Sequence, residues 1–321
     1  MHEEQIRNDV IQLAQPEGRM VGTSGHDVAA EYLIERLGQL GIDPYVGGSF
    51  ALPYETDGQR FINLVGQIPG SNPDLPPVLL GAHYDTCGPY PGADDNAAAV
   101  AVVLAVARTL VQTQAERTVI FALFDAEEPP HFQRSSMGST RFYEDQRTGS
   151  IHCAIILDLV GHDIPVPGLS DLLFITGMES DPGLERVVQN CAPTDVIRTV
   201  PTLNRYEGDL SDHGVFRVNE RPYLFLTCGR WEHYHAHSDT PDRLNYSKIA
   251  AIAKYAQALI EQVSGSDLNG PFETSSTLET ELHFLRQSVE PVVQDMGHPI
   301  SLRSRQDIDG LVDLLVYQLG L

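Results

Sequence analysis

Hydrophobic residues follow two spacings along this chain, one typical of helices and one typical of buried strands. Between Ala29 and Leu40 apolar residues lie three or four positions apart and Gly41 follows, which predicts an amphipathic helix that ends at this glycine. Short apolar runs cover 61–67, 77–82, 118–124, 153–157, 172–176 and 222–227, and helical stretches lie at 96–111, 182–190 and 247–263. This alternation predicts an α/β fold with a mixed, mainly parallel central sheet and helices on both faces.

A polar segment rich in Gly and Ser, SGSDLNGPFETSS, follows residue 263 and indicates a linker or a surface excursion. It divides the chain into a main domain over 1–265 and a helical C-terminal extension over 266–321. Apolar residues recur at helical spacing in this extension, at Leu282, Leu285, Val289, Ile308, Leu311, Leu315 and Leu319. We expect these faces to pack on the body or on a partner subunit, the second case giving a homo-oligomer.

The net charge of the chain limits the classes of partner that it can bind. With 44 acidic and 21 basic residues among 321, the formal net charge is -23, which disfavours binding to nucleic acid or to an anionic membrane. No apolar run approaches the roughly 20 residues of a membrane span, and MHEEQIRNDV lacks the basic and apolar parts of a signal peptide. The four cysteines form no CxxC pair, which indicates free thiols. We therefore expect a cytoplasmic protein.

Candidate metal ligands stand where predicted strands end. The segment VLLGAHYD carries His83 and Asp85, IFALFDAEE carries Glu127 and Glu128, and AIILDLVG carries Asp158. In open parallel sheets, ligands bind beyond the carboxyl ends of the strands, so these side chains are expected to converge.

Two further segments add to this set. His235 follows the apolar run YLFLTC, and PGADDN places Asp94 and Asp95 at the start of a helix after the turn residue Gly92. Imidazole and carboxylate ligands suit zinc. Five ligands exceed what one catalytic zinc with an open position needs, but they suit two ions that share one carboxylate. Glu127 is then free to act as general base.

The ordered segments HYD, PGADDN, AEE, LD, SDH and YHAHSDTPD resemble those of the co-catalytic zinc aminopeptidases and carboxypeptidases of metallopeptidase family 28, from about Gly22 to Val263. The resemblance implies two zinc ions per chain and a peptide substrate. It implies that Asp95 bridges the ions, that His83 and Asp158 complete one site, and that Glu128 and His235 complete the other.

The resemblance also implies the roles of two acids beside the ligands. Glu127 would be the general base that activates a metal-bridging hydroxide, and Asp85 would orient the imidazole of His83. The chain departs from the family after the Glu pair, where the loop 129–138 reads PPHFQRSSMG and suggests an altered substrate range.

Several neighbouring residues have competing interpretations. Asp94 is expected to have a structural role, and His233 and His237 are expected to hydrogen bond or face solvent beside His235. His131, His152 and His162 are interpreted as surface or loop histidines. Cys87 and Cys228 are close in sequence to His83 and His235, and their thiols are expected to be buried and inert.

Four residues are candidates for contact with the substrate, and each has a plainer alternative. Asp212 and His213 in LSDHGVF could open a helix or contribute to a substrate pocket. Arg230 and Trp231 precede His235 and could shape the same pocket.

The leading hypothesis is an aminopeptidase that hydrolyses the bond after an N-terminal residue. Two alternatives share the scaffold: a carboxypeptidase, and a glutaminyl-peptide cyclotransferase with one zinc, whose relatives generally carry a single acid where this chain has the pair Asp94 and Asp95. A binding protein without catalysis is disfavoured, because such relatives are expected to have lost ligands.

Overall fold

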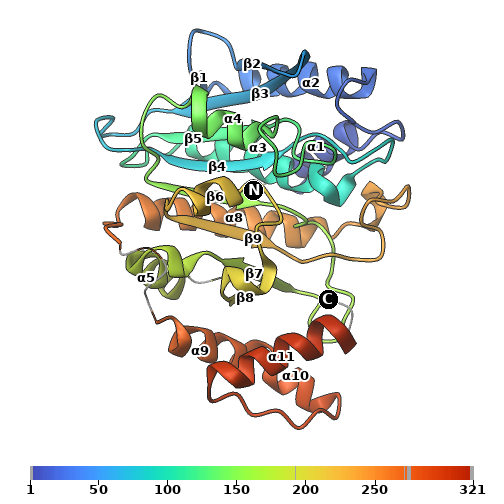
Figure 1. Ribbon diagram of the computed structural model, residues 1–321, viewed down its shortest axis with the longest axis vertical. Coiled ribbons are helices and arrows are strands. Elements are labelled where there is room, and N and C mark those ends of the chain that lie inside the picture. Colours follow the sequence, from blue (N-terminus) through green and yellow to red (C-terminus); the bar gives the residue numbers. More distant parts are fainter. Residues whose placement is uncertain (1–2, 192, 271, 273–275, 319–321) are drawn as a thin grey trace.

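Nine strands join in one sheet in the computed structural model, which describes residues 3–191, 193–270, 272 and 276–318 (Figure 1). Their order is β1-β3-β5-β4-β6-β9-β7-β8, with β2 paired to β3 at one side. The strands are β1 (Asp43–Pro44), β2 (Ala51–Thr56), β3 (Gln59–Ile68), β4 (Val78–His83), β5 (Val119–Phe124), β6 (Cys153–Leu157), β7 (Leu172–Thr176), β8 (Arg198–Pro201) and β9 (Tyr223–Thr227).

The centre of the sheet is parallel and its flanks are not. Strands β5, β4, β6 and β9 are parallel neighbours, whereas β3 pairs antiparallel with β5 and β7 pairs antiparallel with β9. The mixed α/β fold predicted from the sequence is confirmed, together with its six apolar strands. The four central strands end at one edge, so the polar residues that follow them meet there.

Helices cover both faces of the sheet. They are α1 (Glu3–Leu13), α2 (Ser24–Leu40), α3 (Ala99–Leu110), α4 (Gly138–Arg141), α5 (Pro182–Asn190), α6 (Asn204–Glu207), α7 (Gly214–Val218) and α8 (Tyr246–Ser264). Alternate residues of β4 enter opposite cores: Val78 and Leu80 pack with α1, α2, α3 and α8, whereas Leu79 packs with Phe142 and Phe216 on the other face. The period of two along a strand explains this division.

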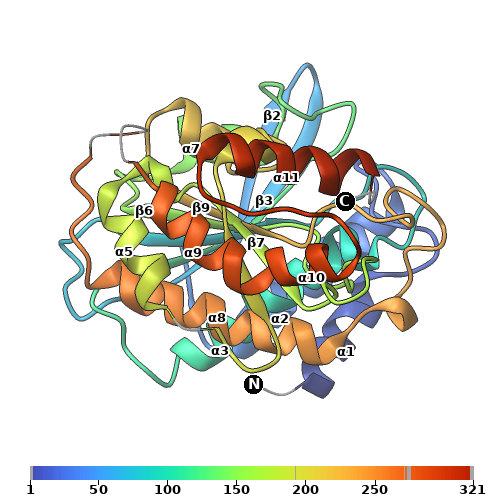
Figure 2. The same ribbon diagram turned by 90° about the horizontal axis from the view of Figure 1, so that it is seen from below.

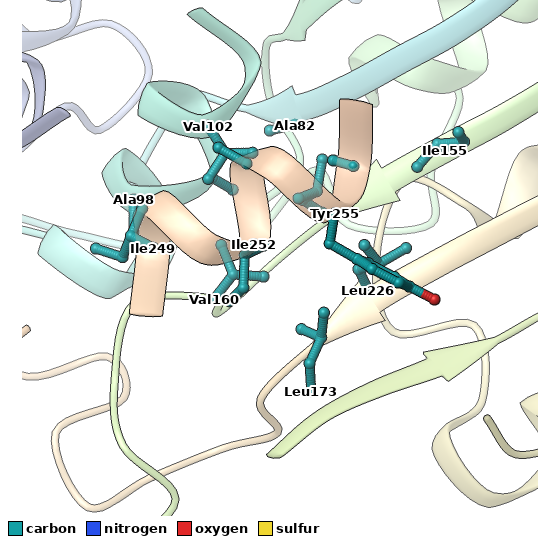
Figure 3. Close-up of a cluster of buried hydrophobic side chains, with 14 of the residues drawn as sticks. Ala82, Ala98, Val102, Ile155, Val160, Leu173, Leu226, Ile249, Ile252 and Tyr255 are labelled. Carbon is teal, nitrogen blue, oxygen red and sulfur yellow. The ribbon is translucent and has the colours of Figure 1, made fainter. Parts of the chain in front are cut away.

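Helix α8 joins the larger core to the sheet. Ile249, Ile252 and Tyr255 of α8 lie against Val102 of α3 and Leu226 of β9 (Figure 3). These side chains are almost fully buried, so the helix and the strand that precedes the His235 loop form one rigid support.

The C-terminal segment forms α9 (Leu278–Ser288), α10 (Glu290–Asp295) and α11 (Arg305–Gln318), which lie beside β7 and β8 (Figures 1 and 2). Leu282, Leu285, Ile308 and Leu311 belong to the same buried cluster as the sheet, so these helices pack on the body. Leu319 and part of the Gly/Ser-rich segment lie outside the described residues.

The sequence also led us to expect free cysteines and showed no apolar run long enough for a membrane span. All four cysteines are free, as predicted. Among the residues that the structure describes, no helix has both the length and the apolar character needed to cross a membrane.

Candidate metal centre

Four strands of the parallel centre deliver the candidate ligands. His83 is the last residue of β4, Asp158 directly follows β6, and Glu128 follows β5. His235 lies in the loop after β9, and Asp95 lies in the helical turn Ala93–Ala98 that precedes α3. The strand ends that the sequence pointed to therefore meet at one edge of the sheet.

Two groups of ligand atoms form around the carboxylate of Asp95. On one side, His83 Nε2 lies 3.4 Å from Asp95 Oδ1 and 3.6 Å from Asp158 Oδ2. On the other, His235 Nε2 lies 3.1 Å from Asp95 Oδ2 and 3.0 Å from Glu128 Oε2. Each oxygen of Asp95 faces a different imidazole, which is the arrangement that a carboxylate shared by two cations requires.

The electrostatics of this cluster suit a divalent cation. Burial lowers the pKa of His235, but its contacts with Asp95 and Glu128 reverse this and raise it to about 10. Burial and then the charge of Asp95 raise the pKa of Glu128 to about 8, and burial raises the pKa of Asp158 as well. Carboxylates gathered out of water repel one another, so positive charge among them, from protons or a metal, stabilises the cluster.

The donor set also fits a metal by its chemistry. His83, Asp95 and Asp158 offer ligand atoms that all lie within 4.8 Å of one another, and Asp158 Oδ1 is buried without a hydrogen-bond partner. Nitrogen and oxygen donors in this number are those that zinc binds.

A sulfur atom lies near the second group. The Cys87 Sγ, a Glu128 oxygen and a His235 nitrogen also lie within 4.8 Å of one another. Cys87 is partly exposed, and burial raises the pKa of its thiol to about 11. The expectation that Cys87 is buried was therefore wrong, whereas Cys228 is buried as expected.

Asp85 supports the ligands from behind. Its carboxylate accepts hydrogen bonds from the backbone N–H of Glu127 at 3.0 Å and of Glu128 at 3.1 Å. The same carboxylate lies 3.4 Å from His83 Nδ1, on the ring nitrogen that faces away from Asp95. One buried side chain thus positions both the imidazole and the loop that carries the Glu pair.

Asp94 supports Asp95 from the opposite direction. Its carboxylate accepts hydrogen bonds from the backbone of Gly161 at 2.6 Å and of His162 at 3.1 Å, and it pairs with His162 Nδ1 at 2.7 Å. Asp239 accepts from the backbone N–H groups of Asp94 and Asp95 at 2.9 and 3.1 Å. The structure therefore places Asp94 in a supporting network, with its carboxylate bonded to Gly161 and His162 and not to the metal ligands.

Left-handed backbone occurs beside three of the site residues. Ala126, Leu159 and His235 have φ of 54°, 53° and 53°. Positive φ is costly for residues with a Cβ and persists where surrounding packing imposes it. It shapes the segments that present Glu127, Asp158 and the His235 imidazole.

This backbone also separates His235 from its neighbours. His233 Nδ1 lies 3.0 Å from Ser238 Oγ, and His237 packs edge-on against Tyr90. An extended segment would have aimed all three imidazoles in one direction. The chain forms turns here instead, so of these three only His235 reaches the carboxylates.

A cavity of about 170 Å³ opens onto the ligands. Glu127 lines it, and its Oε2 lies 3.8 Å from His83 Nε2. Burial, reinforced by the charges of nearby carboxylates, raises the pKa of Glu127 well above its ordinary value. A carboxylate with a raised pKa at the wall of a cavity is suited to accept a proton.

Other residues complete the cavity wall. Tyr234 lines it and stacks on the His235 ring at 3.7 Å, while the Arg230 guanidinium lies 5.0 Å from the centre of the Tyr234 ring. Pro129 and Phe132 place the loop 129–138 beside the ligands. The sequence analysis named Arg230 and this loop as candidates to shape the substrate pocket, and in the structure both line the cavity beside the ligands.

The structure moves several predicted residues away from the cavity. Asp212 and His213 are fully buried and do not line it, so they have no direct access to a substrate there. His213 stacks on Phe225 at 4.1 Å and its Nε2 lies 3.0 Å from the Gly208 carbonyl oxygen. Trp231 stacks on His162 at 4.7 Å, one layer behind the cavity.

His162 lies in the loop after β6, one of the two places expected for it from the sequence, but it is not at the surface. Its side chain is fully buried, stacked on Trp231 and hydrogen bonded to Asp94. Sequence reasoning also gave no role to Tyr234, Glu207 or Asp239. The motif YHAHSDTPD contains Tyr234 and Asp239 and could have indicated them, whereas no sequence signal marks Glu207.

Comparisons with known proteins agree with this site. The sequence model of Peptidase family M28 matches residues 63–260. Uncharacterized protein YfbL of Escherichia coli is 30% identical over 209 residues, covering 56% of this chain and 64% of that protein. Probable leucine aminopeptidase 1 of Trichophyton verrucosum is 25% identical over 229 residues, covering 63% of this chain and 58% of that protein.

The chain thus spans less than two thirds of the length of these two relatives. Among solved structures, the glutaminyl cyclase of Bacteroides thetaiotaomicron bound to N-acetylhistamine superposes with a TM-score of 0.63 at 19% identity. That superposition covers 83% of this chain and 98% of the cyclase, and it shows the fold alone.

Proposed function

The chain belongs to peptidase family M28, and from this membership we propose that it is a zinc-dependent exopeptidase, most directly an aminopeptidase that binds two zinc ions per chain. The observation that carries the proposal is the position of the Asp95 carboxylate, of which one oxygen faces His83 and the other faces His235. His83 and Asp158 would hold one ion, and Glu128 and His235 the other. When bound, zinc would polarise a substrate carbonyl and increase the acidity of water.

Glu127 is the proposed general base. Its carboxylate stands at the cavity wall and is buried among other acids, so it can accept a proton from the attacking water and return it to the leaving amine. Asp85 holds the backbone N–H of Glu127 and thereby fixes where this carboxylate points.

Tyr234 can assist at the developing oxyanion. Burial raises the pKa of its phenol, which therefore stays protonated at neutral pH and can donate a hydrogen bond inside the cavity. The contact with His235 limits how far the ring can move.

Cleavage at a free N-terminus is supported by the charges of the cavity wall. Glu207 lines the cavity outside the proposed ligand set; burial raises its pKa to about 7, and a substrate ammonium group would be a suitable partner for its ionised form. Arg230 lines the same wall and would favour a substrate carboxylate, which keeps carboxypeptidase activity as the variant to be separated by assay.

Glutaminyl cyclisation is the second candidate, because a bacterial glutaminyl cyclase shares this fold. Asp95 lies between the two histidines and can bridge two ions. This favours hydrolysis, because the cyclase alternative uses one zinc. Cyclisation would release ammonia from an N-terminal glutaminyl peptide, whereas an aminopeptidase would release free glutamine.

A Glu127→Gln substitution tests the mechanism. The variant should keep its zinc, because Glu127 is outside the ligand set, and should lose about 10²–10⁴-fold in kcat on aminoacyl amides. Zinc content and turnover are measured on the same preparation, with N-acetylated amides as the control for a free N-terminus. Normal turnover in the zinc-loaded variant would exclude Glu127 as the base.

A further inference from the structure

A second cavity lies next to the metal cavity, between α11 and the sheet. Its volume is about 240 Å³, and we call it the C-terminal chamber. Helix α11 lines it with Ile308, Leu311, Val312 and Leu315, and Phe174 of β7 lines the opposite wall. An apolar cavity of about 150 Å³ is large enough to bind benzene, so the chamber has room for a bulky side chain.

The chamber and the metal cavity share part of their walls. Glu207, Leu210 and Arg230 line both cavities. The two cavities are therefore adjacent, and a side chain that reaches the chamber from a ligand backbone at the metal ligands would pass these three residues.

The chemistry of the wall changes along this path. The metal cavity is bounded by Asp95, Glu127 and other acids, whereas the part of the chamber beyond Glu207 and Arg230 is mainly aliphatic and aromatic. An apolar side chain gains about 25 cal/mol for each Å² that leaves water. An amide or charged side chain would lose its hydrogen bonds with water there.

Two polar contacts hold helix α11 against neighbouring helices. Arg305 donates to the fully buried carboxylate of Glu281 on α9, at 2.6 Å between Nη2 and Oε1. Further along α11, Asp309 accepts a hydrogen bond from the hydroxyl of Tyr206 on α6. Because α6 also carries Glu207, the helix that lines the chamber is tied to the residue at its entrance, and a preformed site binds with less loss of entropy.

The wall formed by α11 lies outside the region that the family model matches. The family match ends at residue 260, whereas α11 covers Arg305–Gln318. Any selectivity that α11 imposes would therefore come from a segment outside that match.

We propose that the C-terminal chamber binds the bulky apolar side chain of the substrate's N-terminal residue, so that α11 selects leucine-like and aromatic residues over small ones. This inference rests on the proposed aminopeptidase function. It assigns to the C-terminal helices a part in substrate selection in addition to packing.

Val312→Trp tests the proposal by filling the chamber, and Val312→Ala tests it by enlarging the chamber. The matched control is Gln306→Trp, because Gln306 is exposed on the same helix and does not line the chamber. The readout is the ratio of kcat/KM for leucine and alanine p-nitroanilides, with zinc content and thermal melting confirming that each variant is folded. We expect a ratio of at least about ten in the unmodified chain and in Gln306→Trp.

The two Val312 variants should change the preference for large side chains in opposite senses, the leucine-to-alanine ratio reporting on Val312→Trp and the phenylalanine-to-leucine ratio on Val312→Ala. Val312→Trp should bring the leucine-to-alanine ratio near one, and Val312→Ala should improve phenylalanine relative to leucine p-nitroanilide. A leucine-to-alanine ratio that is the same in Val312→Trp as in the unmodified chain would overturn the proposal, as would an unmodified chain that prefers alanine.

A binding measurement separates this inference from the proposed function. The fluorescence of anilinonaphthalene sulfonate should rise with the unmodified protein and much less with Val312→Trp. If no anilide is cleaved but the dye distinguishes these proteins, the aminopeptidase function fails and the chamber still binds apolar groups. If anilides are cleaved without side-chain preference, the function stands, and the chamber does not bind the substrate side chain.

Discussion

Asp85 is the residue on which the geometry of the site most depends without being a proposed ligand. It accepts hydrogen bonds from two consecutive backbone N–H groups, those of Glu127 and Glu128, and it lies 3.4 Å from the Nδ1 of His83. The Asp85 side chain is fully buried. A single carboxylate therefore aligns one ligand from each proposed ion and the proposed base.

An Asp85→Asn substitution should weaken zinc binding about 10–100-fold, because asparagine keeps only one accepting oxygen and its N–H₂ group cannot accept the second of the two hydrogen bonds from Glu127 and Glu128. Zinc affinity is measured by competition with a chromophoric chelator. Asp74→Asn is the control, since Asp74 is an exposed aspartate with no place in the site. Equal affinity in the Asp85 variant and the unmodified protein would show that this carboxylate does not position the ligands.

His213 should make stability depend on pH. Burial lowers its pKa from 6.5 to about 4, so the unfolded chain takes up the proton more readily. The contribution of neutral His213 to the free energy of unfolding is complete above pH about 6.5 and is lost as the pH falls toward 4. About 2 kcal/mol of this free energy is lost between pH 7 and pH 5.

The comparison with His213→Gln isolates this effect, because glutamine does not titrate and can still donate to the Gly208 carbonyl. The free energy of unfolding in urea is measured at pH 7 and at pH 5 with chelator present in every sample. The unmodified chain should lose about 2 kcal/mol more than the variant over this interval. Parallel pH dependence in the two proteins would contradict the assignment.

The sequence predicted the location of a site residue well where that residue stands at the end of a strand. His83 and Asp158 come directly at the end of buried runs, so their meeting follows from the parallel sheet. Residues presented by loops were harder: the sequence left His162 as a surface or loop histidine, because nothing in it reveals that the loop buries this side chain against Asp94. Glu207 was missed because its approach to the cavity depends on how the loops around α6 fold.

Among the elements, the strands with both faces buried were predicted and the edge strands were not. The strand β2 alternates only weakly between buried and exposed residues, and β8 has four residues. Helix α1 carried an available signal, since Ile6, Val10 and Leu13 are buried at helical spacing. Local pattern identifies the central elements, but the pairing of edge elements depends on tertiary contacts.

The attachment of α11 to α9 can be tested at the scale of these elements. Glu281 is fully buried and its carboxylate is paired with Arg305. An Arg305→Met substitution leaves this buried charge without its partner and should lower the free energy of unfolding by about 3 kcal/mol. Urea unfolding gives the measurement.

Two variants accompany this test. Arg303→Met should change stability by less than about 0.5 kcal/mol, because Arg303 is exposed. Adding Glu281→Gln to Arg305→Met should restore much of the loss by removing the unpaired charge. If Arg305→Met and Arg303→Met are equally stable, the ion pair does not hold α11 in place.

At the scale of the molecule, the sheet joins a parallel centre to antiparallel flanks, and the site lies at the edge where the central strands end. The C-terminal helices extend the same core beyond β8 and bring the chamber beside the metal cavity. Neither the order of the strands nor this packing is encoded in any local pattern. Both result from burying apolar faces that occur far apart in the sequence.

The central claim is a hydrolase with two zinc ions, and zinc titration of the chelated protein tests it most directly. Metal content and leucine p-nitroanilide hydrolysis are followed together as zinc is added. The account predicts binding of about two zinc ions per chain, with full turnover only when both are bound. Full activity with one zinc per chain, or ammonia release from a glutaminyl peptide without hydrolysis of the anilide, would contradict it.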